Sequence, residues 1–127
     1  MRVAAVLCCL TALAARPLTA PDLILPNKPD SVKFATIGDN GTGEPPEFEV
    51  ANQMTAWHDT FPFEIVIMLG DNLYGSQQPA DFVQKFQRPY QRLLNAGVQF
   101  FACLGNHDRT DNDDYKPFNM NGHRYYT

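Results

Sequence analysis

The chain has 127 residues, a formal net charge of −4, and 44% hydrophobic and 19% charged residues. This composition is typical of about one globular domain and excludes an intrinsically disordered chain. Without a basic patch, the negative charge argues against nucleic acid as a partner, although bound metal ions would still let an acidic protein bind phosphate esters.

The first 15 residues have the pattern of a signal peptide. Arg2 precedes the uncharged apolar run Val3 to Leu13, and Ala12-Leu13-Ala14 resembles a cleavage site. The run is shorter than the roughly 20 residues that span a membrane. Residues 16–31 then form a predicted extended linker, because they include Pro17, Pro21, Pro26 and Pro29. We therefore expect a secreted or periplasmic protein with no stable membrane span after cleavage.

Three apolar runs predict three β-strands: Val32–Ile37, Glu64–Leu69 and Val98–Leu104. Continuous runs of this kind are typical of strands that are buried on both faces of a parallel sheet. Cys8 and Cys9 would leave with the signal peptide, so Cys103 in the third run is expected to remain as a buried free thiol.

Two helical segments alternate with these strands. The first is Pro46–Thr60, where apolar residues share one face at helical spacing: Val50, Met54 and Trp57, with Phe61 just beyond. The second is Pro79–Asn95, in which Pro89 predicts a kink or two short helices. Its predicted buried stripe is Phe82, Phe86, Tyr90, Leu93 and Leu94. The order β-α-β-α-β predicts an α/β fold with parallel strands, because crossovers of this kind are nearly always right-handed.

Each predicted strand ends in glycine followed by polar side chains. The three segments are Gly38-Asp39-Asn40-Gly41, Gly70-Asp71-Asn72-Leu73-Tyr74 and Gly105-Asn106-His107-Asp108. The carboxyl ends of parallel strands share one edge of the sheet, which is where such sheets bind ligands. Two carboxylates there, with no Lys or Arg in the loops, would repel each other unless cations bound between them. Oxygen ligands suit hard cations, so we predict a two-metal site in which Asp71 bridges the ions.

These three segments resemble the first three motifs of the calcineurin-like metallophosphoesterases, and more narrowly those of the purple acid phosphatases. Gly41 stands where many metallophosphoesterases have a metal-binding histidine. Tyr74 stands three residues after Asp71, where purple phosphatases have a tyrosinate. The resemblance implies that residues 32–127 are the N-terminal part of such a domain. The expected fold is therefore the β-α-β-α-β half of a four-layer α/β/β/α sandwich, with metal-binding loops at the carboxyl ends of its strands.

The resemblance also implies a role for each residue of the three segments. Asp39 and Tyr74 would bind Fe(III), Asp71 would bridge both metals, and Asn106 would bind a divalent Fe, Zn or Mn. His107 would contact the phosphoryl group or the leaving oxygen, and Asp108 would orient its ring. A metal-bound hydroxide would attack the phosphate ester. The residues next to the ligands, which would support them, are Asn40 and Asn72.

The family pattern requires three further histidine ligands, which we expect from a C-terminal half that follows Thr127. His123 has no second histidine after it and is predicted to be a surface residue. Because metal sites with missing ligands hold metal weakly, the 127-residue polypeptide alone is expected to be inactive or nearly so.

Other functions remain as alternatives. The glycines Gly38, Gly41 and Gly43 do not form the G-x-G-x-x-G order of dinucleotide-binding folds, and no Gly-Lys-Ser/Thr follows them. An aspartyl phosphatase of the haloacid dehalogenase type would need Asp where Gly41 stands. The alternatives left open are a phosphodiesterase of the same superfamily and a non-catalytic secreted module that binds phosphate or a nucleotide.

Overall fold

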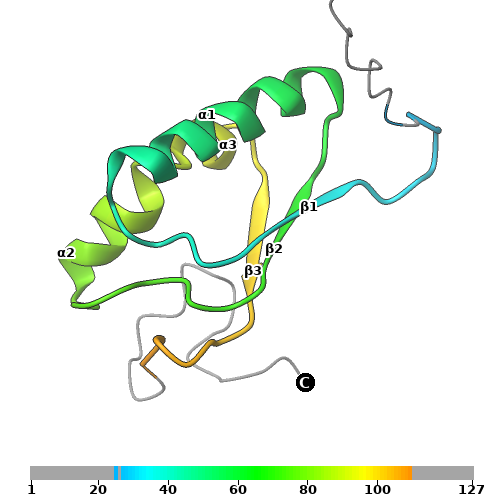
Figure 1. The fold of residues 1–127 in the computed structure, drawn as a ribbon. Helices are drawn as coiled ribbons and strands as arrows, with labels where there is room; N and C mark the ends of the chain where they lie inside the picture. The colour runs from blue at the N-terminus through cyan, green and yellow to red at the C-terminus, as the bar shows by residue number, and fades with distance from the viewer. Residues whose placement is uncertain (1–24, 26, 110–127) are drawn as a thin grey trace, which may run out of the picture.

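The computed structural model of the chain describes residue 25 and residues 27–109. Three strands form one sheet, and helices connect them in the predicted order β-α-β-α-β (Figure 1). The strands are β1 (Phe34–Ile37), β2 (Ile65–Met68) and β3 (Gln99–Ala102). The helices are α1 (Pro45–Thr60), α2 (Pro79–Phe82), the π-helix η1 (Val83–Gln87) and α3 (Gln91–Asn95).

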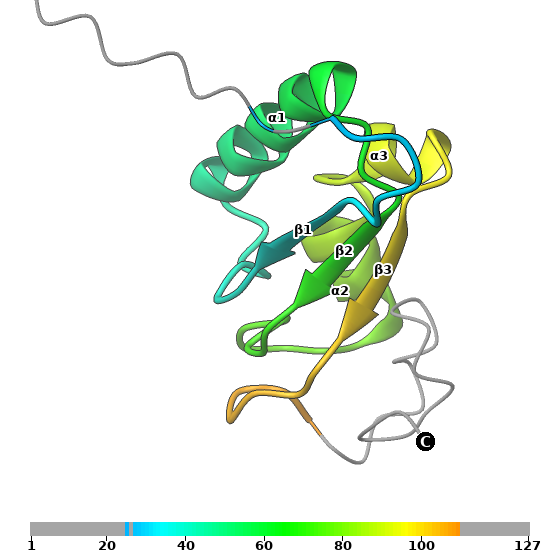
Figure 2. The ribbon, with the colours of Figure 1, turned by 90° about the vertical axis from the view of Figure 1, so that its right-hand side faces the viewer.

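The strands are parallel and lie in the order β1-β2-β3. The first residues of the three strands pair with one another, and so do the last residues. The first residues are Phe34, Ile65 and Gln99, and the last are Ile37, Met68 and Ala102. Each strand has four residues, so the strands are shorter than the apolar runs that predicted them. All three carboxyl ends therefore meet at one edge, where three loops follow them (Figure 2).

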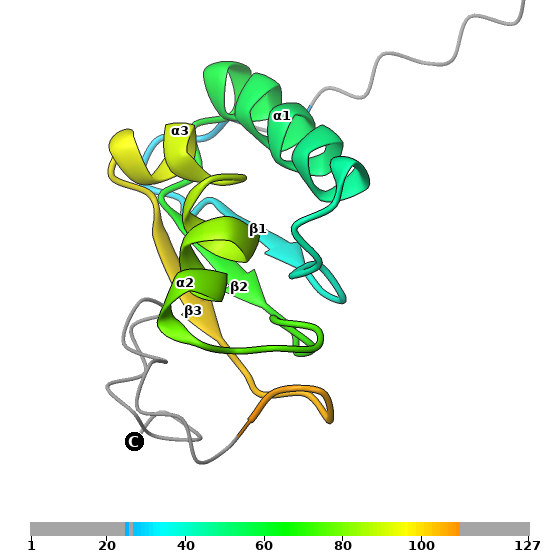
Figure 3. The same ribbon diagram turned by 90° about the vertical axis from the view of Figure 1, so that its left-hand side faces the viewer.

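All the helices lie on one face of the sheet (Figures 2 and 3). Residues that face them are buried, such as Val66, Met68 and Phe100. Their neighbours Ile65 and Ile67 point to the other face and are only half-buried. The expectation that the strands are buried on both faces is therefore wrong for the described residues. The core between helices and sheet consists of Ala51, Phe63, Val66, Met68, Leu73, Phe82, Phe86, Tyr90, Leu93, Val98, Phe100 and Ala102.

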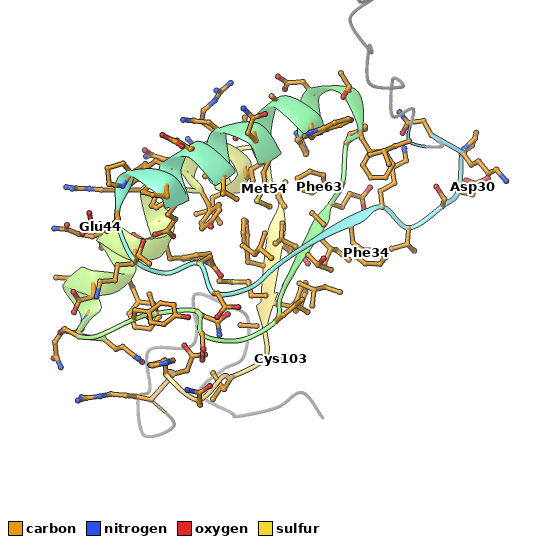
Figure 4. All side chains as sticks on the ribbon, viewed as in Figure 1. Asp30, Phe34, Glu44, Met54, Phe63 and Cys103 are labelled. Atoms are coloured by element: carbon orange, nitrogen blue, oxygen red, sulfur yellow. The ribbon has the colours of Figure 1, made fainter. Side chains whose placement is uncertain are left out.

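Helix α1 turns a different face to the core than its apolar spacing indicates. It buries Glu47, Ala51 and Thr55, whereas Val50 and Trp57 are 48% and 43% exposed. Glu47 turns inward because its carboxylate accepts hydrogen bonds from the backbone of the loop after β1. The predicted stripe does share one face, and Figure 4 shows Met54 and Phe63 between α1 and the sheet. That face lines an apolar groove of about 430 Å³, although Met54 and Phe61 also pack against the edge of the core.

The second helical region is divided as Pro89 predicts. Helices α2 and η1 run continuously to Gln87, a turn follows at Arg88 to Tyr90, and α3 begins at Gln91. The chain then turns at Gly97, whose φ is +86°. The predicted stripe of this region is confirmed: Phe82, Phe86, Tyr90 and Leu93 are buried, and Leu94 packs against them.

The predicted signal peptide, most of the predicted linker, and His123 lie outside the described residues. Within the described part of the linker, the chain turns at Pro29 and Asp30, and Asn27 Nδ2 donates a 2.8 Å hydrogen bond to the carbonyl of Thr60. Among the helices of the described residues, none has the length and apolarity needed to cross a membrane. Cys103 lies just past the end of β3 and is exposed, so its predicted burial is wrong (Figure 4).

Candidate metal centre

Two aspartates turn the chain at the ends of β1 and β2. Asp39 and Asp71 both have positive φ values, 53° and 51°, and Gly70 has a φ of 117°. Aspartate is among the few residues that adopt this left-handed conformation at modest cost. The two turns are linked, because Asp39 N donates a 3.1 Å hydrogen bond to the carbonyl of Gly70. The sequence predicted the turns at Gly38 and Gly70 but not the strained backbone of the two aspartates.

Tyr74 lies between the two carboxylates. Its hydroxyl is 2.8 Å from Asp39 Oδ1 and 3.5 Å from Asp71 Oδ2. The hydrogen bond to Asp39, together with desolvation and the negative charges of both aspartates, raises the pKa of Tyr74 to about 12. Three oxygen atoms from two loops therefore lie close together: two carboxylate oxygens and the phenol oxygen, whose proton points toward the carboxylates.

The loop after β3 joins the same cluster. Asp71 Oδ1 accepts a 2.9 Å hydrogen bond from the backbone N–H of His107, and the ring of His107 is 4.8 Å from that of Tyr74. The side chain of His107 is exposed at this edge, as is that of Asn106, which precedes it in the same loop. All three loops that the sequence predicted to meet therefore do so.

Asp108 ties the loop after β3 to the loop after β2. It is 6% exposed, and its two carboxylate oxygens accept four hydrogen bonds. The donors are the backbone N–H groups of Asn72, Leu73 and Gly105 and the side-chain amide of Asn72. The structure therefore makes Asp108 the residue that fixes the two loops together. The resemblance implies that Asp108 orients the ring of His107. None of these four hydrogen bonds comes from that ring, so this role stays a prediction.

The two asparagines beside the aspartates have different surroundings. Asn72 is fully buried, and its Nδ2 donates to the carbonyl of Cys103 at 2.7 Å and to Asp108 Oδ2 at 2.9 Å. Asn72 thus supports the loops that carry Asp71 and Asn106. Asn40 points away from them, and its Nδ2 is 3.4 Å from the hydroxyl of Tyr90.

Residues 32–127 match the calcineurin-like phosphoesterase family. The chain belongs to this family. No significant match was found among curated proteins or among solved structures. Calcineurin-like phosphoesterases are metal-dependent hydrolases of phosphoesters, and they typically bind two metal ions.

The donor atoms of this phosphoesterase fit a hard cation. Asp39, Asp71 and Tyr74 offer carboxylate and phenol oxygens within hydrogen-bonding distance of one another. A phenol binds a metal as phenolate, and because the pKa of a free phenol is near about 10, a strong Lewis acid is needed to displace its proton at neutral pH. Among the described residues, no group of three or more His, Cys, Asp or Glu side chains could hold a metal ion. The fit therefore depends on the phenol and on Asn106 as well as on the carboxylates.

Sequence reasoning missed two residues that hold the loops of the phosphoesterase in place. Gln77 is 2% exposed, and its Nε2 donates to the carbonyls of Leu73 and His107, at 3.0 and 2.7 Å. Lys85, on η1, donates to the carbonyls of Tyr74 and Ser76 at 2.8 and 2.7 Å. Lys85 also forms an ion pair with Asp81, four residues before it on the chain. This spacing is the only sequence signal for any of these contacts.

Proposed function

We propose that this calcineurin-like phosphoesterase is of the purple acid phosphatase type and hydrolyses phosphate monoesters with Fe(III) and a divalent Fe, Zn or Mn. The observation that carries the proposal is the position of Tyr74. Its hydroxyl is 2.8 Å from Asp39 Oδ1 and 3.5 Å from Asp71 Oδ2, so a cation that replaces the phenol proton would meet all three oxygens. A phenolate ligand favours a trivalent ion, because the ion must displace the proton of a phenol whose pKa is near about 10 when it is free.

The backbone at Gly41 supports a tyrosine rather than a histidine as the ligand of the first metal. Gly41 is buried, and a Cβ added there would overlap the backbone carbonyl of Asn72 and crowd Leu73. Backbone atoms on the neighbouring loop are not free to move aside. A histidine at position 41, where many members of the family have a metal ligand, would therefore not fit between these two loops.

We assign the remaining roles from the positions of the side chains. Asp71 accepts a hydrogen bond from the backbone of His107 with one oxygen and lies 3.5 Å from the Tyr74 hydroxyl with the other. These contacts to two loops support our proposal that Asp71 bridges the metals. Asn106 would hold the divalent ion. When bound, the two ions supply the Lewis acid that activates water and neutralises charge on the phosphoryl group.

His107 is proposed to act on the substrate through its ring. Its backbone is fixed on both sides, by Asp71 at the N–H and by Gln77 at the carbonyl. The ring itself is exposed beside Tyr74, and we propose that it donates a hydrogen bond to the phosphoryl group or to the leaving oxygen. We also propose that residues 1–15 direct export of the chain and are then removed, as its N-terminal sequence predicts.

The experiment that tests this proposal is metal reconstitution with Fe(III), followed by a visible absorption spectrum. The expected result is a phenolate-to-iron charge-transfer band that disappears in Tyr74→Phe, while Tyr90→Phe, which removes a buried hydroxyl elsewhere, keeps it. An iron-bound protein without that band would contradict the assignment of Tyr74. A comparison of an aryl phosphate monoester with the matching diester, on preparations that retain two metals, separates a phosphatase from a phosphodiesterase.

A further inference from the structure

Of the three clustered oxygen ligands in the proposed centre, Tyr74 lies furthest along the chain from the sheet. Asp39 follows the end of β1 by two residues and Asp71 follows the end of β2 by three, whereas Tyr74 follows β2 by six. The next residue, Gly75, has a φ of +69°, and no atom beyond its chain neighbours lies within 4 Å of a Cβ built there. The position of the phenol therefore depends on how the backbone on either side of Tyr74 is held.

The backbone of Tyr74 is held on both sides by hydrogen bonds. Its N–H donates to the carbonyl of Gly41 at 2.9 Å, and its carbonyl accepts from Lys85 Nζ at 2.8 Å. The planar peptide groups before and after a residue set its φ and ψ, and with them the direction of its Cα–Cβ bond. Among the described residues, Lys85 is the only donor to the carbonyl of Tyr74. Lys85 therefore fixes one of the two peptide groups that orient the phenol toward Asp39.

Lys85 is itself held by three acceptors and by packing. Its ammonium group has three N–H donors. Besides the carbonyl of Tyr74, it donates to the carbonyl of Ser76 at 2.7 Å and pairs with Asp81 Oδ1 at 3.5 Å. A Cβ built on Gly43 would lie 3.2 Å from Lys85 Cγ, so the stem of the lysine runs beside the loop after β1. The side chain is only 15% exposed, and it has little freedom to leave the carbonyl of Tyr74.

The helix that carries Lys85 is the π-helix η1, in which Arg88 N donates to the carbonyl of Val83 at 2.9 Å. Turns of this kind are rare and occur frequently at functional sites. Phe86, the neighbour of Lys85 on η1, is 1% exposed and belongs to the core. Lys85 thus connects the loop after β2 to a helix that is packed on the sheet, rather than to another loop.

We propose that Lys85 is a positioning residue for Tyr74: by holding the carbonyl of Tyr74 from η1, it places the phenol oxygen beside Asp39 and Asp71. None of the hydrogen bonds of Lys85 goes to a ligand side chain, so it acts through the backbone of Tyr74. The inference rests on the proposed function only in that Tyr74 is taken to be a metal ligand. Replacing a residue that supports a ligand in this way typically weakens metal binding by about 10–100-fold.

The first measurement uses the metal-free 127-residue chain. The ring centroids of Tyr74 and His107 are 4.8 Å apart, so nuclear Overhauser effects between their ring protons report the position of Tyr74. We expect a clear loss of intensity in Lys85→Met, which keeps the apolar stem but has no donor, and recovery in Lys85→Arg, which keeps N–H donors and the charge. Gln84→Met, an exposed change on the same helix, should leave the intensity unchanged. If Lys85→Met folds poorly, the uncharged and shorter Lys85→Gln gives the same comparison.

The second measurement is a titration of the same chains with Fe(III) at pH 5, followed at the phenolate-to-iron band. Burial raises the pKa of Glu47 to about 7, so at pH 5 this residue is mostly protonated and its attraction to Lys85 does not enter the comparison. We expect Lys85→Met to need about tenfold more Fe(III) for half-saturation than the unchanged chain does. Lys85→Arg and Gln84→Met should stay within about threefold of the unchanged chain, because the carbonyl of Tyr74 keeps its donor.

The two measurements separate this inference from the proposed function. Unchanged effects between Tyr74 and His107 in Lys85→Met would overturn the inference, and so would half-saturation at the same Fe(III) concentration as the unchanged chain. Loss of these effects in metal-free Lys85→Met, with no iron band in any of the chains, would support Lys85 as the residue that positions Tyr74. The same result would contradict the assignment of Tyr74 as a metal ligand.

Discussion

Asp108 holds Asn72 at two points: the backbone N–H of Asn72 is 2.8 Å from Asp108 Oδ1, and its side-chain Nδ2 is 2.9 Å from Asp108 Oδ2. Leu73 N and Gly105 N add two further hydrogen bonds, at 3.1 and 2.7 Å. Because both oxygens accept only from N–H groups, Asp108 acts as a buried anchor for the loops that carry Asp71 and Asn106. The shape of the proposed metal centre would therefore depend on a residue that need not touch a metal.

This anchor predicts a large loss of stability in Asp108→Asn. The amide nitrogen of asparagine would face N–H donors, and at least two of them would lose their acceptor in a buried place. We expect the free energy of unfolding to fall by about 2–4 kcal/mol, as measured by urea denaturation. Asp59→Asn, an exposed change on α1, should stay within about 0.5 kcal/mol of the unchanged chain. A loss for Asp108→Asn no greater than that of the control would contradict the anchor.

The second prediction rests on the close packing of the loop after β1 against the loop after β2 at Gly41. In Gly41→Ala, the new methyl group would overlap the carbonyl of Asn72, and relief requires the β1 and β2 loops to separate. We expect a loss of about 3 kcal/mol or more in urea denaturation.

Gly75→Ala is the matched comparison for Gly41→Ala. Gly75 has a φ of +69° but no atom within 4 Å of an added Cβ, so only the backbone conformation is penalised. The expected loss is about 1 kcal/mol. If both variants lost the same amount, the overlap at Gly41 would not be the reason for glycine at that position.

The pH dependence of stability offers a third prediction, through Glu47. Its pKa is raised from 4.5 to about 7 in the folded chain, so folding favours the protonated acid. The contribution to stability is fully present below about pH 4.5 and is lost as pH rises through 7. Glu47→Gln mimics the protonated acid and should match the unchanged chain at pH 4. At pH 8 it should be more stable by about 1–2 kcal/mol, once screening by nearby water is allowed for.

The measurement for Glu47 is the difference in unfolding free energy between the two chains across pH 4–8. The titration of other groups cancels in this difference. Glu49→Gln should give a flat difference over the same range, because Glu49 is exposed. A flat difference for Glu47→Gln as well would show that the buried carboxylate does not titrate in this range.

A fourth prediction concerns the lysine on the π-helix. Lys85→Met removes the two hydrogen bonds that hold the carbonyls of Tyr74 and Ser76, while the apolar stem remains. We expect faster hydrogen exchange at the amide of Tyr74, which donates to the carbonyl of Gly41 at 2.9 Å. Lys28→Met, an exposed substitution, should leave that amide unchanged. Unchanged exchange in Lys85→Met would mean that the Tyr74 loop is held by other contacts.

The sequence was enough to predict the order of elements, the parallel sheet and the meeting of three loops, because strand periodicity and crossover handedness are local or general rules. It was not enough for the face of α1. Apolar spacing indicated Val50 and Trp57, but Glu47 turns inward to accept two backbone hydrogen bonds from another loop. A pattern of apolar residues does not record a contact between a polar side chain and the backbone of the loop that precedes its helix.

For the same reason, some residues around the site could be predicted from the sequence and others could not. Asp39, Asp71 and Tyr74 follow strand ends at positions where motif spacing is informative, and the structure brings them together. Gln77 and Lys85 act through backbone carbonyls of loops that only the folded chain places beside them. The exposure of Cys103 follows from a strand that ends at Ala102, two residues earlier than the apolar run suggested.

The central claim is that Asp39, Asp71, Tyr74 and Asn106 form a centre for two metal ions. The most direct test is anomalous diffraction from crystals of the chain soaked with an excess of Fe(III) and Zn²⁺, so that sites that lack the expected histidine ligands are still filled. We predict two peaks that share Asp71, one of them bonded to the Tyr74 oxygen in place of the hydrogen bond to Asp39. Iron bound elsewhere, with Tyr74 still donating to Asp39, would contradict it.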